Sequence, residues 1–174
     1  APGYSQPSND VTFFVGSDPH YGNCGTGVPC SADISRGAIE RMNMLPGAFY
    51  PAAVGGGVVD TPRGVLLIGD LTHVSQVTEW TAFTNDWGLN GERLLRFPLY
   101  EGYGNHDAHN DFVPSAIRAR NPLRSSVCNI STNGYHYSWD WAFLHIVCLN
   151  LVPGNEPDLL GNDPHYSLSF LKDD

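Results

Sequence analysis

Positive charge is scarce in this sequence of 174 residues, which contains a single lysine, Lys172, and has a formal net charge of −9 at pH 7. General affinity for nucleic acids requires a basic surface that neutralises phosphate groups, so the composition argues against that class of partner. A site in which bound metal ions supply the positive charge is not excluded.

Long hydrophobic runs are also absent. None approaches the roughly 20 apolar residues that a membrane-spanning helix needs, so no transmembrane segment is expected. Hydrophobic residues nevertheless make up 41% of the chain, which is enough for the core of one domain. We expect residues 1–10, rich in proline, serine and asparagine, to form a loose arm, and residues 11–174 to form the folded part.

Cysteine is scarce as well, with four residues. Cys24 and Cys30 stand close together in a loop rich in glycine and proline, where they can form a disulfide. Cys128 and Cys148 are a second candidate pair, although Cys148 lies in an apolar segment where a buried free thiol also packs well. Disulfides, a glycosylation sequon at Asn129 and a start without methionine together favour a secreted glycoprotein.

Apolar strand-like runs alternate with amphipathic segments over the first two thirds of the chain. This alternation predicts parallel strand–helix–strand units, with strands at 11–15, 64–68 and 98–103 and helices at 32–45, 77–87 and 111–121. In the first helix, Asp33 or Ser31 is expected to cap the N-terminus, with Ile34, Ala38, Met42 and Leu45 on one face. The fold class is therefore α/β.

The last third changes character. Residues 135–141 alternate like a half-exposed strand, with the aromatic side chains on the packed face, and residues 142–151 are apolar like a central strand. We expect the two to pair antiparallel through a tight turn at 140–142, and residues 166–171 to begin a helix.

Polar side chains of metal-ligand type follow each of the three predicted parallel strands. Asp18 and His20 follow the first strand, Asp70 follows the second, and Asn105 and His106 follow the third. Because ligand sites form where the carboxyl ends of parallel strands meet, these side chains should lie together. Desolvating them is costly unless something binds them, so the sequence predicts a metal site at this edge of the sheet.

The spacing and the donor types suit a pair of metal ions. In an extended segment, Asp18 and His20 would point to the same side and reach one ion. Asp70 is a lone carboxylate that can bridge two cations, and Asn105 offers a neutral oxygen. Carboxylate, imidazole and amide donors together are compatible with zinc, manganese or iron.

Other residues near these ligands are candidates for substrate contacts, namely His73, His109, Tyr21 and Asn23. For His73 the alternative is a capping role at the next helix, and for His109 a solvated position in a loop. His136 and His145 lie inside strand-like runs and are predicted to be structural.

These motifs resemble a known family. Asp18-x-His20, Gly69-Asp70 and Gly104-Asn105-His106-Asp107 resemble, in order, the first three motifs of the calcineurin-like metallophosphoesterases. The resemblance implies part of a four-layer α/β/β/α sandwich with mixed sheets and hydrolysis of phosphate mono- or diesters at a dinuclear metal centre. It also implies ligand roles for Asp18, His20, Asp70 and Asn105, with Asp70 bridging. His106 would contact the phosphate and protonate the leaving oxygen, and Asp107 would orient His106 from behind.

The sequence departs from the family in several respects. The later motifs, a lone ligand histidine and a Gly-His-x-His, are absent, so the resemblance implies an N-terminal half whose C-terminal half is missing or supplied by a second polypeptide. Position 73 is histidine, where an iron-binding purple acid phosphatase would have tyrosine. The cysteine loop and a glycine-rich excursion over residues 48–63 lengthen the spacing from Asp18 to Asp70 and are expected to border the substrate site.

Two other functions remain open. One is a binding or structural protein that keeps the scaffold without turnover. The other is a sphingomyelinase-like lipid phosphodiesterase, which predicts an exposed apolar rim near residues 46–58.

Overall fold

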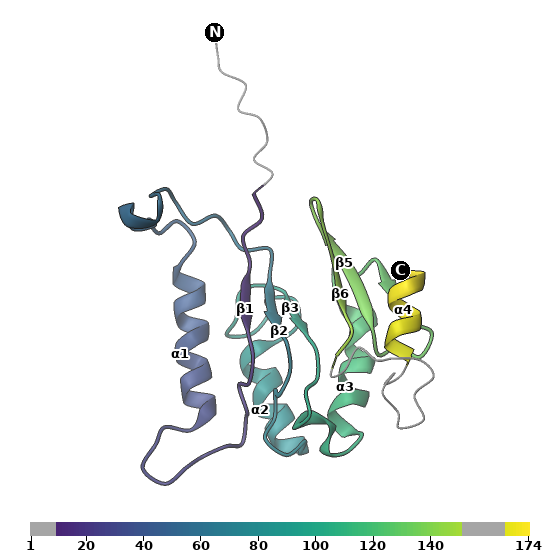
Figure 1. Cartoon of the computed structure of the whole chain (residues 1–174). Coiled ribbons are helices and arrows are strands. Elements are labelled where there is room, and N and C mark those ends of the chain that lie inside the picture. The colour runs from purple at the N-terminus through teal and green to yellow at the C-terminus, as the bar shows by residue number, and fades with distance from the viewer. Residues whose placement is uncertain (1–9, 151–165) are drawn as a thin grey trace.

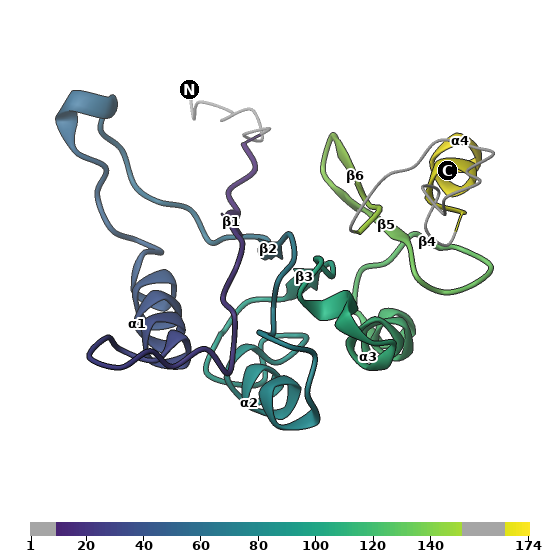
Figure 2. The ribbon, with the colours of Figure 1, turned by 60° about the horizontal axis from the view of Figure 1, so that its bottom comes forward.

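The computed structural model describes residues 10–150 and 166–174 and has a mixed α/β fold. Two three-stranded sheets are present in these residues, one parallel and one antiparallel, with helices beside them (Figures 1 and 2). The expectation that each sheet mixes strand directions is therefore wrong for this part of the chain. The arm predicted at the N-terminus lies, except for Asp10, outside the described residues.

The three predicted strands form a parallel sheet. It consists of β1 (Phe14–Gly16), β2 (Val65–Leu67) and β3 (Leu99–Glu101), with β2 in the middle. Phe14 pairs with Val65, and Val65 pairs with Leu99. Each strand is shorter than the apolar run that predicted it. β1 is also less buried than expected, because it forms an edge of the described sheet and leaves Val15 61% exposed.

Three helices follow the strands close to the predicted positions. They are α1 (Ser31–Met44), α2 (Val77–Trp87) and α3 (Phe112–Arg120). The bounds of α2 match the prediction, and Gly88 ends it with a positive φ of 67°. The N-cap of α1 is Cys30 without a side-chain hydrogen bond, so neither Ser31 nor Asp33 caps it.

The main core lies between α2 and one face of the parallel sheet. Trp80, Phe83 and Trp87 of α2 pack there with Leu67 and Leu99. The opposite face presents Tyr100, which stacks on Trp139 with ring centroids 4.3 Å apart. Aromatic packing thus joins the two sheets face to face, which accounts for the aromatic alternation in the sequence.

The antiparallel sheet contains β4 (Asn129–Ile130), β5 (Tyr137–Trp141) and β6 (Leu144–Cys148). The turn lies at 142–143, one to two residues later than predicted, and Ala142 adopts a φ of 55° there. β5 is not half-exposed: His136 and Ser138 are fully buried. The reason is α4 (Ser167–Asp173), whose Phe170 packs beside His136 with ring centroids 6.0 Å apart.

A histidine holds α4 against the hairpin. His145 Nδ1 lies 2.6 Å from Asp140 Oδ1, and its Nε2 lies 2.7 Å from Asp174 Oδ2. Asp174 also accepts hydrogen bonds from Asn129 and Ser138. The hydrogen bonds that the His145 ring donates to Asp174 and Asp140 raise the pKa of His145, and the bond to Asp140 lowers the pKa of that carboxyl group. The pKa of Asp174 is also lowered, because its hydrogen bonds outweigh the opposing effect of burial.

These shifts predict a bounded pH window for this contact. His145 contributes stability below its ordinary pKa of 6.5 and loses it as pH rises through the higher folded value. Asp140 and Asp174 contribute stability at pH values above their ordinary pKa of 3.8. They lose this contribution as pH falls through their lowered folded-state pKa values. The variant His145→Gln is therefore expected to be least stable, relative to wild type, between these limits, as measured by urea unfolding at several pH values. His109→Gln is the control, and a deficit that does not shrink as pH rises above this window would contradict the prediction.

The glycine-rich excursion leaves most of its apolar side chains exposed up to Val58, as an apolar rim requires, although Val59 is buried. Phe49 is 81% exposed and Val54 is 69% exposed. In Figure 1, however, the excursion and its short helix (Ala52–Val54) lie beyond the C-terminal end of α1, away from the loop that follows β1. The excursion therefore does not border the predicted metal site, which removes the main support for a lipid phosphodiesterase acting there.

One of the two candidate disulfides is formed. Cys24 and Cys30 are bonded, with their Cα atoms 4.3 Å apart. Cys128 and Cys148 carry free thiols, so the second pairing is wrong and the alternative of a free thiol at Cys148 is correct. Cys128 is exposed, whereas burial raises the pKa of the Cys148 thiol.

Among the described residues, no helix combines the length and the apolar character needed to cross a bilayer.

Candidate metal centre

Three of the four predicted metal ligands meet at the carboxyl ends of β1 and β2. His20 Nε2 lies 3.5 Å from Asp18 Oδ1 and 3.7 Å from Asp70 Oδ2. One ligand atom from each of Asp18, His20 and Asp70 falls within 4.8 Å of the others. This is close enough for one cation to be shared among them after small side-chain rotations.

The backbone at these three residues is strained. Asp18, His20 and Asp70 have φ values of 57°, 42° and 51°. A left-handed backbone is unfavourable for residues other than glycine and persists where the surrounding structure enforces it, often at functional sites. The segment from Asp18 to His20 is therefore not extended, as the sequence suggested, although both side chains still reach the same place.

Backbone hydrogen bonds hold the two loops in this conformation. Asp18 N–H donates to the Gly69 carbonyl at 3.0 Å, and His20 N–H donates to the Asp70 carbonyl at 3.0 Å. The Ser31 hydroxyl, at the start of α1, donates to the His20 carbonyl at 2.5 Å. The loop after β1 is thus fixed on both sides by bonds that leave the ligand side chains free.

The loop after β3 closes on Asp70. The His106 backbone N–H donates to Asp70 Oδ1 at 2.9 Å, so this carboxylate is oriented by the motif that follows β3. Gly104 lies against Asp70 so closely that an added Cβ would meet the Asp70 backbone nitrogen at 2.5 Å. Asn105, the fourth predicted ligand, is exposed on this same loop.

Asp107 does not orient the His106 ring as the resemblance implied. It is fully buried and accepts hydrogen bonds from the backbone N–H groups of Leu71, Thr72 and Gly104 and from the Thr72 hydroxyl, at 2.7–3.0 Å. Burial raises the pKa of Asp107, against the effect of these donors. Asp107 is therefore a structural clamp between the loops after β2 and β3, and Thr72 is the partner that the sequence did not reveal.

The His106 ring is oriented by a different group. Its Nδ1 lies 2.7 Å from the His73 carbonyl oxygen, so Nδ1 carries the proton and Nε2 is left for other contacts. The His73 ring stacks on the His106 ring with centroids 5.5 Å apart, and His109 stacks on His106 at 5.3 Å. His73 therefore points into the centre rather than capping α2, while His109 remains exposed.

The two remaining candidates for substrate contacts differ. Tyr21 is fully buried in the core, and its hydroxyl donates to Asp86 at 3.0 Å, so it cannot contact a substrate. Burial raises the pKa of Tyr21 far above its ordinary value, with a further contribution from Asp86. Asn23 is exposed beside the centre and remains a prediction.

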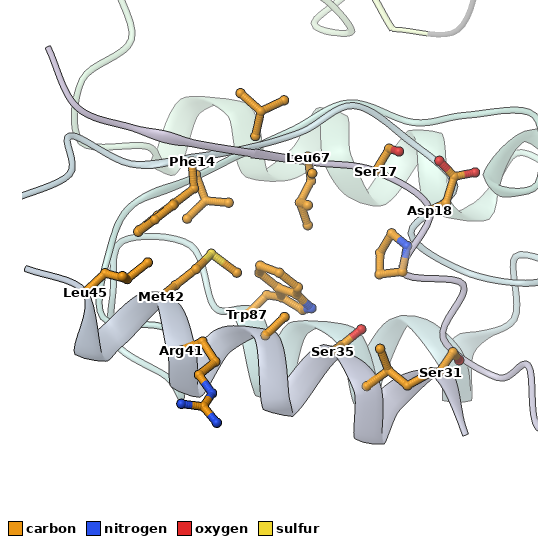
Figure 3. A pocket seen from close by; sticks show the side chains of 16 residues that line it. Phe14, Ser17, Asp18, Ser31, Ser35, Arg41, Met42, Leu45, Leu67 and Trp87 are labelled. Carbon is orange, nitrogen blue, oxygen red and sulfur yellow. The ribbon is translucent and has the colours of Figure 1, made fainter. Parts of the chain in front are cut away.

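A separate cavity of about 470 Å³ lies between β1 and α1. The predicted apolar face of α1 lines it, together with Phe14, Leu67 and Trp87 (Figure 3). Asp18 lies at one end, and its carboxylate is directed away from α1 (Figure 3). His20 and Asp70 are not among the residues that line this cavity, so of these three ligand candidates Asp18 alone borders it.

The residues present fit a bound metal. Two carboxylates and an imidazole converge, and within the described residues the ion pairs of Asp18 and Asp70 are to His20 alone. This donor set suits zinc, manganese or iron. The Nδ1 atoms of His20 and His73 are buried and have no hydrogen-bond partner among the described residues. Such buried polar atoms are costly unless they are satisfied, and they indicate a ligand on the histidine side of the centre, distinct from an ion held by the carboxylates and His20 Nε2.

Comparison with known proteins adds no family assignment to this geometry. The chain matches no protein-family model, and no curated protein is significantly similar to it in sequence.

Proposed function

We propose that this chain hydrolyses phosphate esters at a dinuclear metal centre, as the N-terminal half of a calcineurin-like metallophosphoesterase domain. The observation that carries the proposal is the convergence of Asp18, His20 and Asp70, each on a left-handed backbone, at the carboxyl ends of parallel strands. His106 lies beside them on the loop that orients Asp70.

The packing order supports the four-layer architecture. The parallel sheet carries α2 on one face and the antiparallel sheet on the other, and α4 packs against the far side of β5. A C-terminal half, if supplied by a second polypeptide, would add the histidine ligands that this sequence lacks. The bonded Cys24–Cys30 pair favours export of the protein, with Asn129 as an exposed site for glycosylation.

The chain's own residues have distinct roles in this proposal. Asp18 and His20 would hold one ion, Asp70 would bridge, and Asn105 would hold the second. The ions would supply positive charge for the phosphate and an activated water. His106, held through Nδ1 by the His73 carbonyl, would present Nε2 to the substrate and, in its doubly protonated imidazolium form, deliver the Nε2 proton to the leaving alkoxide.

The test is hydrolysis of p-nitrophenyl phosphate and its bis-ester with added Zn²⁺, Mn²⁺ or Fe²⁺. Asp70→Asn is expected to reduce kcat/KM by at least about 100-fold, and His106→Ala by about 10²–10⁴-fold. We expect weak metal binding and slow turnover from this chain alone. Both metal affinity and turnover should increase when a polypeptide carrying the later histidine motifs is added.

His145→Gln is the matched control, because His145 lies on the antiparallel sheet away from the centre. It should leave kcat/KM unchanged at a temperature where the variant is folded. Absence of both metal and turnover from the complete assembly would refute the enzyme and favour a non-catalytic scaffold.

A further inference from the structure

We propose that His20, His73 and His106 form a three-histidine site for a borderline divalent ion such as Zn²⁺, with His73 as a metal ligand. This assignment differs from the dinuclear centre, in which His73 has no ligand role and His106 is free.

Three observations place the rings together. One nitrogen of each ring lies within 4.8 Å of a nitrogen of each of the other two. Ring centroids are 4.4 Å apart for His20 and His106 and 5.8 Å apart for His20 and His73. The three histidines come from the loops after β1, β2 and β3. Backbone hydrogen bonds fix the first two loops to each other, and the His106 N–H fixes the third to the Asp70 carboxylate.

Each of these rings has a nitrogen that is available to bind a metal ion. His20 Nδ1 and His73 Nδ1 are buried without a hydrogen-bond partner in the described part of the chain. His106 Nδ1 is engaged by the His73 carbonyl oxygen, which fixes the tautomer and leaves Nε2 as its donor. An ordinary buried histidine satisfies its ring nitrogens with hydrogen bonds, so these atoms indicate a ligand.

The donor set selects the class of ion. Three imidazoles suit zinc, copper, nickel or cobalt and disfavour magnesium and calcium, which prefer oxygen. Tetrahedral zinc with Zn–N bonds of about 2.0–2.1 Å brings the nitrogens to roughly 3.3 Å from one another. The observed separation of up to 4.8 Å needs only modest rotation of the partly exposed rings to reach that value.

Occupancy of this site has a consequence that rests on the proposed function. An ion on His106 Nε2 would remove the group that serves the leaving oxygen, and an ion on His20 would compete with the dinuclear centre. Excess zinc should therefore inhibit hydrolysis, and His73→Ala should relieve that inhibition.

The experiment measures binding rather than turnover. The full chain is titrated with Co²⁺, whose four-coordinate complexes absorb strongly in the visible range, and Zn²⁺ affinity is measured by competition with a chromophoric chelator. His73→Ala, and His73→Gln as a bulkier second variant, should lose the cobalt bands and bind Zn²⁺ at least about 100-fold more weakly, more than loss of a supporting group would cause. His109→Ala, which removes an exposed ring stacked on His106, is the matched control and should retain both signals.

Further variants separate this site from the dinuclear centre. Asp18→Asn should retain the cobalt bands even if it abolishes hydrolysis, so failure of the proposed function leaves this site intact. If His73→Ala and His109→Ala behave alike, or if Asp18→Asn removes the bands while His73→Ala keeps them, the three-histidine site is refuted. Circular dichroism establishes that each variant is folded.

Discussion

Replacing Glu101 by glutamine is expected to lower the free energy of unfolding by about 3–5 kcal/mol, because it leaves buried arginine charge without a partner. Glu101 is fully buried in β3. Its Oε2 lies 2.9 Å from Arg124 Nη1, and its Oε1 lies 2.9 Å from Arg120 Nε. The Arg124 side chain is 1% exposed, so water cannot replace the lost carboxylate.

The pH dependence of this effect follows from the same contacts. Burial opposes ionisation of Glu101, but the attraction of Arg124 and Arg120 holds its pKa below the ordinary value of 4.5. A carboxyl group with a lowered folded pKa contributes stability above its ordinary value and loses it as pH falls through the folded value. The difference in free energy of unfolding between wild type and Glu101→Gln should therefore be largest at pH 7 and decrease in acid.

An exposed ion pair on the same molecule provides the control. Asp33 and Arg36 on α1 are 3.1 Å apart, with side chains 63% and 48% exposed. Asp33→Asn should cost no more than about 1 kcal/mol. Urea unfolding of both variants measures the contrast, and equal losses would show that burial of Glu101 does not determine the effect.

Gly104→Ala is expected to destabilise the fold by about 1–3 kcal/mol and to weaken metal binding at the same time. The added Cβ would lie 2.5 Å from the Asp70 backbone nitrogen and 2.8 Å from the Asp70 carboxylate carbon. The backbone of Gly104 cannot shift away, because Gly69 packs against it. A Cβ built on Gly69 would lie only 2.9 Å from the Gly104 Cα atom. The alanine must therefore push Asp70 away from Asp18 and His20.

Gly37→Ala is a matched substitution that should change the free energy of unfolding in the opposite direction. Gly37 lies inside α1, and a Cβ added there meets no atom within 4 Å. Gly37→Ala should raise the free energy of unfolding by about 0.5–1 kcal/mol through helix propensity. Thermal unfolding and Zn²⁺ competition are measured on both variants. A Gly104→Ala protein with wild-type zinc affinity would contradict the close contact with Asp70.

Sequence patterns predicted the parallel sheet well because each strand is a short apolar run that ends at glycine or at a polar motif. The positions of Asp18, His20 and Asp70 followed from that topology alone. The partners of Asp107 could not be predicted, because the bonds to Leu71 and Thr72 join loops 35 and 36 residues apart in sequence. The burial of His136 was missed for a similar reason, since it depends on α4 covering a strand face that looked solvent-exposed.

Local pattern was also a poor guide to backbone conformation at the ligands. The alternation of Asp18 and His20 suggested an extended chain, but both residues are left-handed because the neighbouring loop pairs with them. The sequence left open whether His73 would point into the site or cap the next helix, and the stacking of its ring on His106 depends on how two loops meet.

The left-handed backbone at Asp18, His20 and Asp70 places binding and folding stability in opposition at these positions. Each such residue costs about 1 kcal/mol or more relative to a relaxed backbone, and glycine relieves much of that cost. A related sequence selected only for folding would therefore be expected to acquire glycine at these positions. Glycine at all three would mark a relative without the proposed metal site, whereas aspartate and histidine retained despite the strain would mark one still selected for that site.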